Sequence, residues 1–258
     1  MKYLGKAFWI VVLLSASLTS CYAPKEVYKS TGDIVVLDSV RAPYIDSAVY
    51  YQVESYKKAL DAEMNEIIGH TETQMFRDIP QGLLNNFVAD LVLNKGNEAY
   101  RPSDGQAIDF CLLNYGGLRS SLPKGNITRG NVFELMPFEN EMIVVTISGE
   151  KTKDLFEYLS RKNNWGMPVS GIQLKVKNNE VIEVKIQGKS LDLSRNYKIL
   201  TSDYLATGGD KMDFFLQAIS YEPLNLRIRE VIIEYFVNQS AQGKIAKSQI
   251  DDRFIVIE

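Results

Sequence analysis

The 258-residue sequence contains a single histidine, His70, and only two cysteines, Cys21 and Cys111. A dinuclear metallophosphatase centre needs several histidines and carboxylates that converge on two metal ions. A Ser-His-Asp triad would have to use the same histidine, and the G-x-S-x-G turn that presents such a serine is absent. We therefore assign no catalytic residue, and we expect His70, in GHTET, to be a solvent-exposed turn residue.

An excess of basic residues is also missing, because the net charge is −3. Nucleic-acid binding usually requires a basic footprint, so we predict no nucleic-acid partner. The sequence has neither a Walker A motif nor G-x-G-x-x-G. Cys111 lies within an apolar run, which is typical of an inert core thiol rather than of a nucleophile.

The N-terminus has the layout of a secretory signal. MKYLGK is basic, AFWIVVLL is a short apolar run, and SASLTSC supplies small residues that end at Cys21. LTSC resembles a bacterial lipobox, so we predict a lipoprotein signal peptide over 1–20, followed by a lipidated Cys21 and a polar tether over 21–32. The alternative is a plain signal peptide with an incidental cysteine. The predicted location is the bacterial cell envelope, lipid-anchored on the periplasmic side or at the cell surface.

Residues 33–258 should form one domain of mixed α/β (α+β) class, with strands flanked by helices. Apolar spacing predicts one helix over 46–68 that ends at Gly69, and a second over 79–96 with Leu83, Phe87 and Leu91 facing inward. The other expected helices cover 149–163 and 226–239. Strands are expected over 33–40, 107–117, 140–148, 172–178, 180–188 and 197–202.

Three segments place polar or aromatic groups at the ends of expected strands: LLNYGGLRSS (112–121), FELMPFENEM (133–142) and SDYLATGGDKMDFF (202–215). Arg119 offers a planar donor fork that suits a phosphate or carboxylate. Phe138 and Tyr204 could sandwich a planar ring, and the Asp210 carboxylate could accept hydrogen bonds from a ribose. Phe138 could equally be a core aromatic residue.

Within these segments, NYGGLR (114–119), PFEN (137–140) and DYLATGGDK (203–211) follow in order. They match the patterns N-x-G-G-[IL]-R, P-F-x-N and [NDS]-[FY]-x-A-x-G-G-D-G. From about Asp33 to its C-terminus, the chain thus resembles the C-terminal, substrate-binding domain of the 5'-nucleotidase / UDP-sugar hydrolase family.

The resemblance implies a role for each matching residue. Arg119 would bind the substrate phosphate, with Asn114, Gly116 and Gly117 shaping its loop, and Arg77, in MFRDIP, is a candidate second phosphate ligand. Phe138 and Tyr204 would clamp the base, Asn140 would contact the base, and Asp210 would contact the ribose hydroxyls. Gly208 and Gly209 would form a tight turn that positions Tyr204 and Asp210. The chain departs from the pattern at Lys211, where the family has glycine, and at Tyr204, where phenylalanine is commoner.

Full-length family members also carry a metallophosphatase domain that holds two metal ions. The resemblance therefore implies a nucleotide- or nucleoside-binding chain that works with a separate metallophosphatase chain and is inactive alone. Divalent metals are expected only on that partner, and no cofactor is expected on this chain. The alternative is a non-enzymatic binding or scaffold lipoprotein of the envelope, whose pocket is vestigial or altered.

Overall fold

The computed structural model describes residues 31–32, 34 and 46–257. The predicted signal peptide, Cys21 and almost all of the strand expected over 33–40 lie outside these residues. The chain divides into two units, Met1–Tyr51 and Gln52–Glu258. Helix α2 (Ser47–Met64) begins in the first unit and ends in the second, and none of its residues is buried. No helix in the described part combines the length and apolar character that a membrane crossing requires.

A five-stranded sheet with the order β10-β4-β9-β2-β5 organises the second unit. The apolar runs predicted as strands supply its centre, and alternate residues point to opposite faces. Val144 and Leu200 enter one buried cluster, whereas Val145 and Ile199 enter the other. The strands are β2 (Phe110–Leu112), β4 (Glu141–Ser148), β5 (Val169–Ser170), β9 (Asn196–Ser202) and β10 (Ser220–Arg227).

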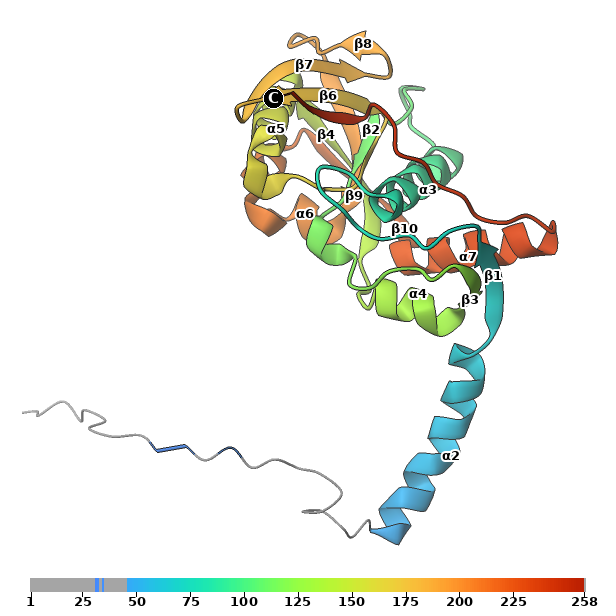
Figure 1. Cartoon of the computed structure of the whole chain (residues 1–258). Helices are drawn as coiled ribbons and strands as arrows, with labels where there is room; N and C mark the ends of the chain where they lie inside the picture. Colours follow the sequence, from blue (N-terminus) through green and yellow to red (C-terminus); the bar gives the residue numbers. More distant parts are fainter. Residues whose placement is uncertain (1–30, 33, 35–45, 258) are drawn as a thin grey trace, which may run out of the picture. The chain divides into compact units, whose positions relative to one another are not determined.

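Helices and a second sheet cover the two faces of this sheet. Helices α3 (Leu83–Ala99), α4 (Arg129–Leu135) and α7 (Ile228–Ala241) contribute to one core cluster. Helix α5 (Gly149–Ser160) packs on the other face and against β7, as Figure 1 shows. The second sheet has the order β11-β6-β7-β8 and consists of β6 (Ile172–Lys177), β7 (Glu180–Ile186), β8 (Lys189–Ser190) and β11 (Phe254–Ile257). The mixed α/β class is thereby confirmed.

A third, two-stranded sheet corrects the prediction around His70. Helix α2 ends at Met64, and Gly69 lies within β1 (Ile67–Thr71), which pairs with β3 (Gly125–Thr128). The expected helix end at Gly69 is therefore wrong. A Cβ atom at Gly69 would lie 2.7 Å from the ring of Phe236, so close packing of α7, not a helix end, explains the glycine. His70 is exposed, as expected, but it belongs to a strand rather than to a turn.

One expected strand is shorter than predicted, and one edge strand was not predicted. The strand expected over 107–117 is limited to β2, and Tyr115–Gly117 form a 3-10 turn. Strand β10 was not predicted, and it contains Pro223, a residue type that is excluded from most ladder positions. Because β10 is an edge strand, it tolerates the missing N–H group of Pro223.

Candidate functional site

Strand order and register bring the three sequence motifs together at one end of the central strands of the five-stranded sheet. β9 lies between β4 and β2, antiparallel to the first and parallel to the second. Met142 pairs with Ser202 at the end of β9, and Asn140, two residues before Met142, bonds Asp203, which directly follows β9. Cys111 pairs with Leu200 in parallel register, and the Thr201 hydroxyl donates to the Leu112 carbonyl at 2.8 Å, so the ends of β2 and β9 lie together. The ends of β2 and β9 and the start of β4 therefore meet at this end of the sheet, which we call the motif edge.

Two exposed arginines meet at the loop that follows β2: Arg119 belongs to this loop, and Arg77 reaches it from the segment between β1 and α3. Arg77 Nη1 donates to the carbonyl oxygens of Leu118 at 2.7 Å and Tyr115 at 3.2 Å, and its guanidinium lies 4.5 Å from the centre of the Tyr115 ring. The Arg119 side chain makes one long hydrogen bond, 3.4 Å, to the carbonyl of Gly116. Its guanidinium therefore keeps most of its donors for a ligand. The structure thus places Arg77 against the loop that carries Arg119.

The segment 133–142, which contains PFEN, is joined to both other motif loops. The backbone N–H of Arg119 donates to the carbonyl of Leu135 at 2.8 Å, at the end of α4. Asn140 Nδ2 donates at 3.0 Å to Asp203 Oδ1, which also accepts the backbone N–H of Tyr204 at 2.8 Å. Asp203 therefore connects the second motif to the third, and this connecting role was not predicted.

Beneath the PFEN segment lies Arg229 of α7, whose residue is only 5% exposed. Its Nη1 reaches the carbonyls of Met136 and Phe138 at 3.5 and 3.4 Å, and its Nη2 binds the Glu139 carboxylate. The hydrogen bond from Arg229 lowers the pKa of Glu139. Arg229 Nε has no hydrogen-bond partner among the described residues, although the Glu230 carboxylate lies 3.5 Å away. A buried arginine therefore supports the backbone that carries Phe138.

The third motif forms a short helix and a tight turn after β9. Tyr204 lies in α6 (Asp203–Ala206), and Gly208 follows with φ of 88°. A Cβ atom at Gly209 would lie 2.6 Å from Tyr204 Cε1 and Cζ, so the tyrosine ring rests directly on this glycine. The Tyr204 hydroxyl donates to Asp210 Oδ1 at 2.9 Å, and this hydrogen bond raises the pKa of Tyr204.

The two expected clamp residues remain accessible at the motif edge. Phe138 is 41% exposed and Tyr204 is 43% exposed, so neither ring is part of the buried core. No ring–ring contact joins them in the described structure. Although Tyr204 rests on Gly209, this exposure leaves part of each ring available for a flat ligand. The Asn114 side chain lies against Gly117, where an added Cβ would approach its Oδ1 to 2.7 Å.

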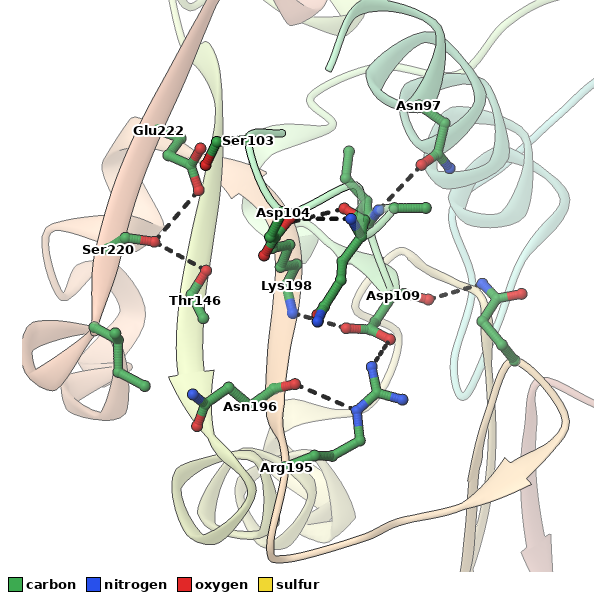
Figure 2. Close-up of a pocket in the computed structure, with 15 residues that line it drawn as sticks. Asn97, Ser103, Asp104, Asp109, Thr146, Arg195, Asn196, Lys198, Ser220 and Glu222 are labelled. Carbon is green, nitrogen blue, oxygen red and sulfur yellow. Dashed lines mark hydrogen bonds and ion pairs between the residues drawn. The ribbon is translucent and has the colours of Figure 1, made fainter. Parts of the chain in front are cut away.

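A separate cavity of about 1110 Å³ lies at the opposite ends of the same strands. It contains Lys198, which is 6% exposed and bonds Asp104 Oδ1 through Nζ at 2.6 Å. Figure 2 shows the Arg195 guanidinium facing Asp109, with which it forms an ion pair. The cations that line this cavity are therefore paired with the chain's own carboxylates, whereas Arg119 at the motif edge has no ion pair among the described residues. We accordingly place the candidate site at the motif edge, although the large cavity lies elsewhere.

Within the described residues, no group of three or more histidine, cysteine, aspartate or glutamate side chains is arranged to hold a metal ion. Cys111 is fully buried in β2, and burial raises the pKa of its thiol above the ordinary range. The thiol is therefore part of the core, in agreement with its apolar sequence context.

Comparison with known proteins identifies related sequences. The sequence profile of the family described as "5'-nucleotidase, C-terminal domain" matches residues 67–217. The trifunctional nucleotide phosphoesterase protein YfkN of Bacillus subtilis is 28% identical over 219 residues, which cover 75% of this chain and 15% of that protein. An apyrase of Tabanus yao is 25% identical over 196 residues, which cover 65% of this chain and 35% of that protein.

The fold also matches solved structures. The 5'-nucleotidase precursor of Thermus thermophilus superimposes with a TM-score of 0.68 at 23% identity, over 83% of this chain and 44% of that chain. The NAD nucleotidase NadN of Haemophilus influenzae gives a TM-score of 0.60 at 16% identity, over 83% of this chain and 42% of that chain. The chain thus spans less than half the length of each of these four proteins.

Proposed function

Since the chain belongs to the 5'-nucleotidase C-terminal domain family, we propose that it recognises nucleotides and nucleosides at the motif edge. The observation that supports this proposal is the meeting of three motifs, distant in sequence, around β9. There they offer two exposed aromatic rings, an exposed carboxylate and two exposed arginines within adjoining loops. A base, a ribose and a phosphate require this combination of groups.

The proposed ligand would lie across the motif edge with its base between Phe138 and Tyr204. Asn140 can donate to or accept from a base edge, although its amide is bonded to Asp203 in the free protein. The ribose would reach Asp210, and the phosphate would take the free donors of Arg119. Arg77 donates to carbonyls of the Arg119 loop and is proposed mainly to hold that loop.

Hydrolysis is proposed to come from a separate metallophosphatase chain that holds the divalent metals. The sequence contains one histidine, too few for the histidine-rich dinuclear centre that such chemistry uses. This chain would then contribute binding and positioning to nucleotide catabolism. Lipid on Cys21 would anchor it in the cell envelope, and mass spectrometry of the mature N-terminus tests this anchor.

Calorimetry with the full chain, in the absence of metal, tests recognition directly. Adenosine and 5'-AMP should bind, and Phe138→Ala or Tyr204→Ala should each weaken both by roughly five- to 150-fold, since stacking contributes about 1–3 kcal/mol per base. Arg119→Ala should remove the advantage of 5'-AMP over adenosine. Tyr56→Ala, which removes an exposed aromatic ring of α2 outside the motif loops, is the matched control and should bind as the wild type does.

The assignment of hydrolysis to a partner has its own test. Phosphate release from 5'-AMP should appear only when a metallophosphatase chain is added, and rapid release by this chain with divalent metal alone would contradict the assignment. The departure at Lys211 favours one alternative, a scaffold lipoprotein with an altered pocket. Failure of millimolar nucleoside to bind would support that alternative.

A further inference from the structure

Tyr204 and Asp210 are joined by two hydrogen bonds in the free protein. The Tyr204 hydroxyl donates to Asp210 Oδ1 at 2.9 Å and accepts the backbone N–H of Asp210 at 3.3 Å. A phenylalanine, the commoner family residue here, could form neither bond. The tyrosine therefore places a donor against the carboxylate that the proposed function assigns to the ribose.

The turn holds Asp210 in this position independently of any ligand. Asp210 adopts φ of 52° and ψ of 27°, a left-handed conformation that aspartate tolerates better than most residues. Its carbonyl accepts the Tyr158 hydroxyl at 2.8 Å. The Tyr204 ring rests on Gly209, where no side chain separates it from the turn. The N–H, carbonyl and one carboxylate oxygen of Asp210 are thus all bonded to tyrosine hydroxyls.

The other carboxylate oxygen, Oδ2, has no hydrogen-bond partner among the described residues. A vicinal diol binds a carboxylate best when each hydroxyl donates to a different oxygen. Because Oδ1 already accepts the Tyr204 hydroxyl, only Oδ2 is free of other donors when a ribose binds. Oδ1 keeps a second lone pair, so the other hydroxyl would share this oxygen with Tyr204 or displace the phenol, and two donors on one oxygen each bind it less strongly than one donor alone.

We propose that the Tyr204 hydroxyl is a specificity determinant that weakens the second of the two hydrogen bonds a ribose diol can make to Asp210, so that the site binds ribo- and 2'-deoxyribonucleotides with similar affinity. This inference rests on the proposed function. The Tyr204 ring would stack on the base in both kinds of ligand. Only the second sugar hydroxyl distinguishes them, and the Tyr204 hydroxyl competes with it for Oδ1.

The test compares adenosine with 2'-deoxyadenosine, by metal-free calorimetry, on the full chain and its Tyr204→Phe variant. Both ligands carry the same base, so any change in stacking cancels in the ratio of their affinities. The ratio should lie within about threefold for the wild type and rise to about tenfold for Tyr204→Phe, because a hydrogen bond to a charged group contributes on that order. Adding Asp210→Asn to Tyr204→Phe should return the ratio to near one.

Two results would overturn the inference, and they are distinguishable. If both nucleosides bind but Tyr204→Phe leaves their ratio unchanged, the hydroxyl does not set specificity, while the proposed nucleoside site stands. If neither nucleoside binds to the wild type or to the variant, the proposed function itself fails, and the inference fails with it.

Discussion

The contact between Gly209 and Tyr204 allows one stability prediction to be worked out in detail. Gly209→Ala would place a Cβ atom 2.6 Å from two ring atoms of Tyr204 and 2.6 Å from its carbonyl oxygen. The ring can move only if its hydroxyl leaves Asp210, and the carbonyl contact can be relieved only by a backbone shift. Overpacking of this kind costs about 1–3 kcal/mol. The lost hydrogen bond adds about 0.5–1.5 kcal/mol, near the lower limit because the bond is exposed.

We therefore expect Gly209→Ala to lower the free energy of unfolding by about 2 kcal/mol, and the Tm by about 4–8 °C. Gly116→Ala is the matched control in another motif, because its Cβ would meet nothing closer than Asn114 Nδ2 at 3.8 Å. The control should change stability by no more than about 0.5 kcal/mol. Urea unfolding followed by circular dichroism measures both variants. Equal midpoints for Gly209→Ala and Gly116→Ala would refute the reasoning.

Three other predictions concern residues outside this contact. DTNB should leave the buried Cys111 thiol unmodified in the native chain and modify it after unfolding in guanidinium, as peptide mass mapping can show. Two flanking lysines hold the pKa of Glu183 at about 2, below the ordinary 4.5. A depressed carboxyl pKa stabilises the fold above the unfolded-state value, and this contribution is lost as pH falls through the folded value. Glu183→Gln should therefore lower Tm at pH 7 but not near pH 2, and a difference that persists at pH 2 would contradict this. Arg229→Met should weaken adenosine binding in calorimetry by about tenfold, through loosening of the loop that carries Phe138, and unchanged affinity would argue against that support.

Local patterns in the sequence predicted most of the central elements. The run over 140–148 became β4, which starts one residue later, because the continuous run of β-branched residues over 143–147 suits a sheet covered on both faces. The break between 178 and 180 became a hairpin turn, and Asn178 and Asn179 both adopt positive φ there. These features depend on neighbours in the chain, which sequence reasoning can see.

What the sequence could not show depends on contacts between distant residues. Gly69 has the local context of a helix end, and only the packing of Phe236 explains it. Arg229 looks like a charge on the surface of an amphipathic helix, but it is buried beneath a loop about ninety residues earlier in the chain. Asp203 belongs to the third motif, but the sequence predicted no role for it. Its hydrogen bond to Asn140 of the second motif becomes evident only once β4 and β9 are paired.

The position of β9 has a consequence for how the molecule is made. This strand is placed between β2 and β4, yet it follows both of them in the chain. Until residue 202 has been synthesised, the first two motifs have no strand to hold them side by side. Such non-local pairing slows folding, and any species that lacks β9 would lack the entire motif edge. Ligand binding would therefore report on completed assembly of the whole sheet, and a C-terminal truncation before β9 would abolish binding rather than weaken it.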